Sequence, residues 1–443
     1  MSQRLIPKIP TMSAAAAALV ISMAPVTALA GGLLLYEVGT AEVGLASAGF
    51  GARAQDASTV FTNPAGMTRL DGNQATAAGQ LLWGNTKFSI DRDRTSPALG
   101  SGDGGYVVGS GGWFLGGGAF GTYTVSPDIK LGFGMTGNFG APLSYDNDWV
   151  GRYYVQQTTL LGLSFLPSIA WKATDKLSLG ASLNAMYGIY KNNLAINNID
   201  PRFGDGRLEL KNQTWGFGGN LGMLYEFDKA TRASLTWNSQ VDLDFSSPAN
   251  FSNLAPGVSA ALAKAGLLNN TVNIGIKVPQ GVMGSVFTQV NDRWAVLGSV
   301  GWQQWSKFGQ VQVGLEDTSN PQGGLTTAIP FKDTWHVAVG AQYRPSDPWL
   351  VNFGIAYDSA FQEGSTVSPL LPLNSGWRFG TGAQQQLTKD SNWGFAMEYI
   401  YGGTLNVNLN SRLPVVAGGR GDVVGSFNNI GSIFIATYYN FRF

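Results

Sequence analysis

Histidine and cysteine, on which much enzyme and metal chemistry depends, are almost missing from this chain. Its 443 residues include one histidine, His336, and no cysteine. A hydrolytic site needs a nucleophile within reach of an activating base, and position 338, two residues beyond His336, holds alanine rather than serine. One histidine without cysteine gives no support for a tetrahedral metal site either. The sequence therefore predicts a protein that is not an enzyme and that uses neither a metal nor another cofactor.

Anion binding is the chemistry that three of the basic residues support. Lys332, His336 and Arg378 stand out of phase with the large apolar residues around them, so they should face the opposite side of an extended segment. A carboxylate that is buried away from water needs such a cation or several hydrogen-bond donors. The alternative is that these cations pair with Asp358 or Glu398 and only support the interior of the protein.

The segments that carry these residues have a period of two. From about residue 74 onward, large apolar residues alternate with glycine, alanine, serine and asparagine. In a β-strand, successive side chains point to opposite faces, so this alternation predicts strands with one large apolar face and one small or polar face. Three of the apolar series are Trp215, Phe217, Leu221, Met223, Tyr225 and Phe227; Trp349, Val351, Phe353, Ile355 and Tyr357; and Trp393, Phe395, Met397, Tyr399 and Tyr401.

The composition indicates what these strands face. Charged residues make up 13% of the chain, where a soluble domain carries about a quarter. The 28 basic and 28 acidic residues balance, which argues against a nucleic-acid partner. A soluble β-sandwich would carry charge on its polar faces, whereas aromatic residues at the ends of the apolar series are typical of outer-membrane barrels. We therefore predict an all-β fold, a transmembrane antiparallel β-barrel.

The connections predict the size of the barrel. Six short polar turns, near residues 127, 174, 229, 292, 346 and 390, alternate with seven longer connections. Thirteen connections join about fourteen strands, with the short turns in the periplasm and the long loops outside. The alternating series from Ile433 to Phe443 ends on phenylalanine and looks like the terminal strand that the barrel-assembly machinery reads.

The first 30 residues have the layout of a secretory signal peptide. Arg4 and Lys8 precede an apolar run over residues 14–24, and Ala28-Leu29-Ala30 follows as a cleavage site. Residues 31–73 do not alternate and include glycines and a small-residue stretch. An unplugged barrel of this size would hold an open channel. We therefore expect residues 31–73 to form a hatch inside a barrel that spans residues 74–443.

Four segments resemble the long-chain fatty acid outer-membrane transporter family, the FadL/TodX type. The first runs from Gly44 to Leu70 and ends its small-residue stretch with Asn63-Pro64-Ala65; the others are Asn212 to Phe245, Gln303 to Phe308 and Phe331 to Tyr343. The resemblance spans essentially the whole mature chain. It implies a fourteen-stranded barrel with an N-terminal hatch, and capture of a hydrophobic molecule that then moves through the wall into the outer membrane.

The resemblance also implies which residues bind the ligand and which form its exit. The apolar hatch start, Leu33, Leu34, Leu35 and Tyr36, would bind the ligand tail. A glycine-rich kink in the third strand, at Gly137, Asn138, Phe139 and Gly140, would open the wall beside Asn63, Pro64 and Ala65, and Pro142 would close that strand. A short helix over residues 256–268 would present Val258, Leu262 and Ala265 in an outer groove. Each of these residues could instead serve only in packing.

The sequence thus predicts a monomeric transporter in the outer membrane of a Gram-negative bacterium, in contact with outer-membrane lipids. Its ligand would be a long-chain fatty acid or a similar hydrophobic molecule. One alternative is a carrier of neutral hydrocarbons with the same fold. Another is a general porin, but a porin lines an open lumen with charge, and these inward faces are small and follow a plug.

Overall fold

The computed structural model describes residues 33–268, 270–313, 326–328, 331–362 and 367–443. The predicted signal peptide lies outside these residues. β-Strands are the main regular structure of the described residues, and no helix among them is long and apolar enough to cross a membrane.

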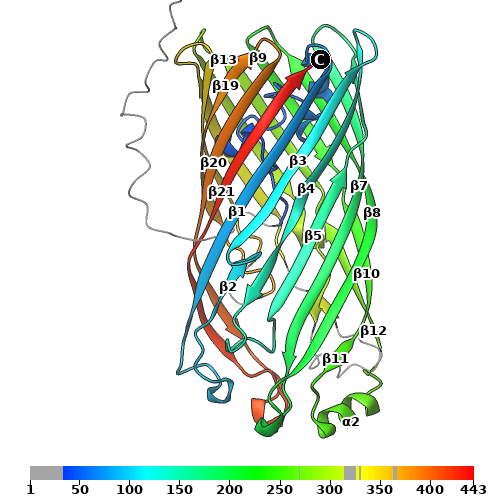
Figure 1. The fold of residues 1–443 in the computed structure, drawn as a ribbon, viewed down its shortest axis with the longest axis vertical. Helices are drawn as coiled ribbons and strands as arrows, with labels where there is room; N and C mark the ends of the chain where they lie inside the picture. The colour runs from blue at the N-terminus through cyan, green and yellow to red at the C-terminus, as the bar shows by residue number, and fades with distance from the viewer. Residues whose placement is uncertain (1–32, 269, 314–325, 329–330, 363–366) are drawn as a thin grey trace, which may run out of the picture.

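Antiparallel strands form a closed ring (Figure 1), because β21 pairs with β1 along almost its whole length. Within the described residues the ring has fourteen wall strands, as predicted. Three wall strands consist of two segments each, β5 with β6, β9 with β10, and β12 with β13, and the short strands β2, β11, β15 and β16 are not counted among the fourteen. The strands are β1 (Gln74–Ile90), β2 (Gly105–Val108), β3 (Trp113–Thr124), β4 (Ile129–Tyr145), β5 (Gln157–Phe165), β6 (Ser168–Lys172), β7 (Leu177–Ile196), β8 (Gly206–Glu226), β9 (Thr231–Asn238), β10 (Val241–Pro248), β11 (Asn250–Ser252), β12 (Thr271–Val278), β13 (Gly281–Gln289), β14 (Trp294–Gln303), β15 (Gln310–Val313), β16 (Thr326–Ala328), β17 (Thr334–Tyr343), β18 (Trp349–Asp358), β19 (Gly376–Thr388), β20 (Ser391–Leu409) and β21 (Val423–Arg442).

The helices are short, and none of them forms part of the wall: η1, α1 and η2 belong to the hatch inside the barrel, and the others lie in the outer connections. Their bounds are η1 (Ala41–Leu45), α1 (Thr59–Thr62), η2 (Pro64–Arg69), η3 (Pro97–Leu99), η4 (Pro201–Phe203), α2 (Pro256–Lys264), η5 (Trp305–Lys307) and η7 (Val415–Ala417). The short turns meet at one end of the barrel, at the top of Figure 1, and the longer connections with α2 meet at the other. Short turns are periplasmic in outer-membrane barrels, so α2 lies on the extracellular side.

The large apolar residues point outward, as their alternation predicts. Phe217, Leu221, Phe353 and Phe379 are among the large hydrophobic side chains that are more than a third exposed in the isolated chain. Aromatic residues also pair across neighbouring strands toward the extracellular end of this apolar surface. Such pairs are Trp83 with Trp113, Tyr187 with Trp215, Trp302 with Trp335, and Tyr357 with Trp377. The outward surface therefore suits a lipid environment with an interfacial aromatic belt.

The small inward residues make room for the hatch, which fills the periplasmic part of the lumen (dark blue in Figure 1). Gly354 of β18 and Gly380 of β19 lie directly against the backbone of η1, where a Cβ atom would overlap Leu45 and Ala46. From the wall, Arg232 of β9 donates hydrogen bonds to the carbonyl oxygens of Ala52 and Arg53 at 2.5 and 2.6 Å. The hatch is thus packed and hydrogen-bonded into a lumen shaped to receive it.

One expectation about the third wall strand is wrong. Pro142 does not close β4, which continues to Tyr145. Proline lacks an N–H group, but its carbonyl oxygen still accepts a hydrogen bond, here from the amide of Gly109 at 2.9 Å. Beyond the proline, the short strand β2 pairs with β4 from Val108 to Tyr106. The partner strand therefore supplies the hydrogen bonds that keep this segment extended.

Candidate functional site

The hatch start, which we define as Leu33 to Tyr36, borders a cavity in the lumen. Leu34, Leu35 and Tyr36 line this cavity together with Met283 and Gln303 of the wall, and its volume is about 50 Å³. A cavity that holds benzene has a volume of roughly 150 Å³, about three times as large. In this conformation the cavity therefore encloses neither a long alkyl chain nor a monoaromatic ring, and the hatch start would have to move for either to enter.

The hatch start also forms hydrogen bonds with the kinked part of β4. The amide of Leu35 donates to the carbonyl oxygen of Asn138 at 2.9 Å, and the amide of Gly140 donates to that of Leu33 at 2.6 Å. Leu34 and Phe139 thus face each other in an antiparallel bridge. A register shift interrupts the pairing of β4 with β5 at this point, and Gly140 has a φ of +84°, which favours glycine. The predicted kink residues therefore hold the hatch start in place.

The wall is incomplete beside this kink. Strand β3 pairs with β4 only from Thr124 to Gly118, where the partner of Gly118 is Thr136. Beyond that pair, the two strands separate and border a hollow of about 610 Å³, lined by Gly116, Gly117, Phe139 and Gly140 among others. A barrel whose neighbouring strands separate in this way lacks ladder hydrogen bonds there. The hatch start replaces part of this missing partner from inside the barrel.

A buried charged cluster lies next to the hatch start. Arg378 of β19 forms ion pairs with Glu37 of the hatch, Asp358 of β18 and Glu398 of β20, the last at 2.9 Å. Nδ1 of His336 lies 2.8 Å from the second oxygen of Asp358. All five side chains are buried. The cluster thus joins the hatch to four neighbouring wall strands.

Tyr36 separates this charged cluster from the cavity. Its ring lies 4.7 Å from that of His336 and 5.8 Å from the guanidinium carbon of Arg378. Its hydroxyl accepts a hydrogen bond from Gln303 at 2.8 Å, and both residues line the cavity. A ligand in an enlarged cavity would therefore reach the cluster where Tyr36 now stands.

The three cations predicted to bind a carboxylate do not all meet. His336 and Arg378 are brought together, but both already contact carboxylates of the protein, which is the alternative that the sequence left open. Lys332 precedes β17 rather than lying in it, and its side chain is exposed. The contribution of Glu37 was missed, although a single acid directly after the apolar hatch start was a signal that could have indicated it.

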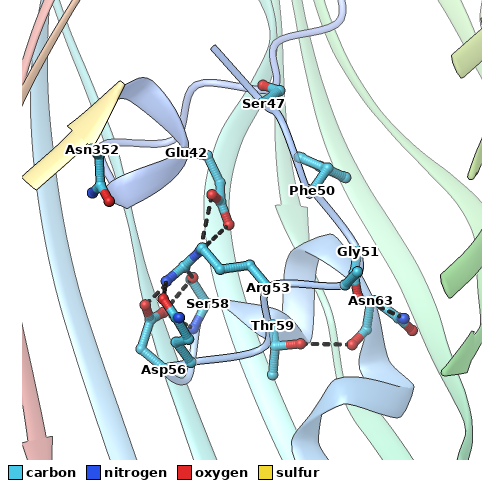
Figure 2. A network of polar contacts seen from close by, with 12 residues as sticks. Glu42, Ser47, Phe50, Gly51, Arg53, Asp56, Ser58, Thr59, Asn63 and Asn352 are labelled. Atoms are coloured by element: carbon cyan, nitrogen blue, oxygen red, sulfur yellow. Dashed lines mark hydrogen bonds and ion pairs between the residues drawn. The ribbon is translucent and has the colours of Figure 1, made fainter. Parts of the chain in front are cut away.

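A second buried ion cluster stabilises the fold of the hatch itself (Figure 2). Nε of Arg53 contacts both carboxylate oxygens of Glu42 at 3.0 and 3.1 Å, and Nη2 lies 2.8 Å from Asp56. Burial raises the pKa of Glu42 to about 7, although Arg53 opposes this shift. Burial also raises the pKa of Asp56, but the charge of Arg53 and hydrogen bonds from Ser58 outweigh it and keep that pKa below its usual value. Two acids thus share one guanidinium, and Glu42 is the one that tends to hold a proton.

The stability of the hatch should consequently depend on pH through Glu42. Because its folded-state pKa lies above the ordinary 4.5, its contribution is complete below pH 4.5 and is lost as the pH rises through about 7. We expect protease cleavage within the hatch to increase between pH 5 and pH 8 in the wild type, and this increase to be much smaller in Glu42→Gln. Limited proteolysis of the purified barrel across that range measures it, and an equal increase in both proteins would contradict the assignment.

The position expected for Asn63-Pro64-Ala65 needs correction. These residues do not lie beside the β4 kink, which Leu33 to Leu35 contact instead. The Asn63 side chain caps η2 by accepting from the amide of Ala65, and it donates to the carbonyl oxygens of Gly51 and of Met223 in β8. Glycines of β7 and β8 leave the space that this turn occupies. The cap on Ala65 is local, but the bond to Met223 joins residues 160 positions apart, so spacing in the sequence did not indicate which wall strand this turn meets.

The outer helix contains the residues expected in the extracellular groove. Helix α2 ends in a Schellman motif, in which Gly266 has a φ of +70° and its amide bonds to Ala263 while that of Leu267 bonds to Leu262. Val258, Leu262 and Ala265 line a hollow of about 300 Å³. Its other side is formed by Ile196, Ile199 and Gly418 to Arg420 of the last outer loop. The contribution of that loop was not predicted, because loop-to-loop contacts leave no periodic pattern.

No group of three or more His, Cys, Asp or Glu residues in the described part of the chain is arranged to hold a metal ion.

Comparison with known proteins gives a family match over nearly the whole chain. The family described as outer membrane protein transport protein (OMPP1/FadL/TodX) matches residues 21–443. Outer membrane protein P1 of Haemophilus influenzae is 28% identical over 405 residues, covering 83% of this chain and 85% of that protein. The long-chain fatty acid transport protein of Escherichia coli K12 is 25% identical over 445 residues, covering 89% and 93%.

Solved structures show the same fold. A Pseudomonas aeruginosa FadL homologue superposes with a TM-score of 0.77 at 18% identity, covering 93% of this chain and 100% of the other. The Pseudomonas putida toluene transporter TodX superposes with a TM-score of 0.62 at 16% identity, covering 89% and 98%. At these identities the likeness concerns the fold alone.

Proposed function

Because this chain belongs to the outer membrane protein transport protein family of OMPP1, FadL and TodX, we propose that it takes up long-chain fatty acids or similar hydrophobic molecules. The family consists of outer-membrane transport channels rather than enzymes. Its relatives include proteins named for long-chain fatty acids and for toluene, so the ligand class must be argued from the site.

Capture begins in the outer groove between α2 and the last outer loop. Its apolar residues, Val258 and Leu262 among them, would hold an alkyl chain, which gains about 0.8 kcal/mol for each buried methylene. The ligand then moves to the lumenal cavity beside the hatch start. Because that cavity is small, entry requires that Leu34, Leu35 and Tyr36 shift, and this shift couples binding to opening of the hatch.

Exit occurs sideways through the gap between β3 and β4. The observation that carries this proposal is the pairing of the hatch start with β4 beside that gap. The segment that would move to admit the ligand is also the one that covers the incomplete wall. One displacement therefore enlarges the cavity and uncovers the path into the lipid, without an open channel to the periplasm.

A carboxylate ligand fits this site better than a neutral hydrocarbon. The cavity lies one aromatic ring away from Arg378 and His336, and a site for neutral hydrocarbons has no use for buried cations. The neutral alternative would leave this cluster with only a structural role.

Native mass spectrometry of the purified full-length protein tests the ligand class. We expect long-chain fatty acids to co-purify and added oleate to displace them. Recovery of neutral hydrocarbons alone would reject the carboxylate role. Large, steady ion currents through single channels would instead reject the plugged transporter.

A further inference from the structure

Glu37 is the one acid of the buried cluster that lies in the hatch rather than in a wall strand. Asp358 and Glu398 lie within β18 and β20, whereas Glu37 directly follows the hatch start. Glu37 and Glu398 both contact Nη1 of Arg378. Both are fully buried, at 0% exposure. A shift of the hatch start would pull Glu37 away from Arg378 and leave the other two acids in place.

The cluster contains more carboxylates than its cations can pair. Three acids surround Arg378, and His336 bonds only to Asp358. The carboxyl groups of Glu37 and Glu398 also contact each other, so the acids are crowded around one guanidinium. Buried charges are costly unless they are paired and hydrogen-bonded. A fourth carboxylate therefore cannot join this cluster unless one of the three acids leaves.

We propose that Glu37 occupies the place of the ligand carboxylate and that a fatty acid opens the hatch by displacing it from Arg378. This inference rests on the proposed function and adds to it the rule by which the protein recognises its ligand. The exchange conserves charge, because one carboxylate replaces another on the same guanidinium. The released Glu37 would move with Tyr36, whose ring now separates the cavity from the cluster.

The exchange makes the response specific for acids. A neutral molecule of the same length could fill the enlarged cavity, but it could not form an ion pair with Arg378 in place of the one that Glu37 gives up. Only burial of the alkyl chain would then offset the loss of the Glu37–Arg378 ion pair, whereas a carboxylate ligand regains an ion pair. Fatty acids should therefore release the hatch start, and the corresponding alcohols should not.

Binding of oleate and oleyl alcohol to two matched variants tests the exchange. Glu37→Gln and Glu398→Gln each replace one carboxyl group at the same guanidinium nitrogen with an amide, but only the first removes the displaceable group. We expect Glu37→Gln to bind oleate about tenfold more tightly than the wild type, the size of effect of one charge-assisted hydrogen bond. Glu398→Gln should show no such gain, and oleate should bind more tightly than oleyl alcohol to all three proteins.

Equal gains in both variants would mean that the local charge alone controls binding, and this would overturn the exchange. An unchanged affinity of Glu37→Gln for oleate would overturn it as well. Failure of all three proteins to bind either compound would instead reject the proposed function. A spin label on Leu34→Cys provides a second measurement in this cysteine-free chain. Its mobility should rise with oleate in the wild-type background, remain unchanged with oleyl alcohol, and already be high without ligand in Glu37→Gln; a label that stays immobile with oleate would contradict the exchange.

Discussion

A disulfide that ties the hatch start to β4 is expected to stop uptake while it is oxidised and to restore uptake when it is reduced. The variant combines Leu34→Cys with Phe139→Cys, at the two residues that face each other in the bridge. The hydrogen bonds of the flanking residues make this a non-hydrogen-bonded pair, whose Cα atoms lie about 4.5 Å apart. That separation falls within the range of natural disulfides.

The physical reason for the block is that the bridge fixes the segment whose displacement has two consequences. With Leu34 held against β4, the cavity stays near 50 Å³ and the gap beside Gly140 stays covered. We expect uptake of labelled oleate by cells that lack other such transporters to fall at least about tenfold. A change of that size corresponds to roughly 1.4 kcal/mol or more, and loss of the path should exceed it.

The chain supplies its own controls for this experiment. Because it has no native cysteine, each single variant can form no internal disulfide and should transport under oxidising conditions. Recovery after addition of a reductant separates a locked hatch from a misassembled barrel. Normal uptake by the oxidised double variant would show that the ligand leaves by a route that does not require this segment to move.

The features that repeat along the chain were those that the sequence could predict. Strand faces follow a period of two, so the outward direction of Phe353 and Trp377 and the inward direction of Arg378 could be read from neighbouring residues. The strand count followed from turns such as that near residue 346. Such features depend only on which residues are neighbours in the sequence. The closed barrel then follows because a closed sheet has no exposed edge.

Single long-range contacts could not be predicted in the same way. Leu35 bonds to Asn138 and Glu37 to Arg378, across more than 100 and more than 300 residues respectively, and neither pair has a repeating pattern. The position of Asn63 was assigned wrongly for the same reason. Pro142 was expected to end β4, because proline cannot donate a hydrogen bond to a sheet and prefers strand ends. That preference does not reveal that a second strand, β2, pairs with β4 beyond the proline.

Replacement of Arg378 by methionine is expected to have the largest effect on stability. Methionine fills a similar volume, but Arg378→Met leaves Glu37, Asp358 and Glu398 buried without their shared cation. Removing one partner of a buried ion pair costs about 3–5 kcal/mol, and here three acids lose the same partner. Urea unfolding of the purified barrel in lipid vesicles, followed by electrophoretic mobility without heating, measures the loss of unfolding free energy.

The compensated variant decides whether charge is the cause of this loss. Arg378→Met combined with Glu37→Gln, Asp358→Asn and Glu398→Gln removes the cation and all three of its carboxylates, so most of the lost stability should return. If the single variant is as stable as the wild type, the acids must already be neutral, and the guanidinium does not hold them. If the compensated variant remains as unstable as the single one, packing around Arg378 rather than charge joins the hatch to the wall. Glu37 would then have no ion pair to exchange with a ligand, so this measurement also bears on how the hatch opens.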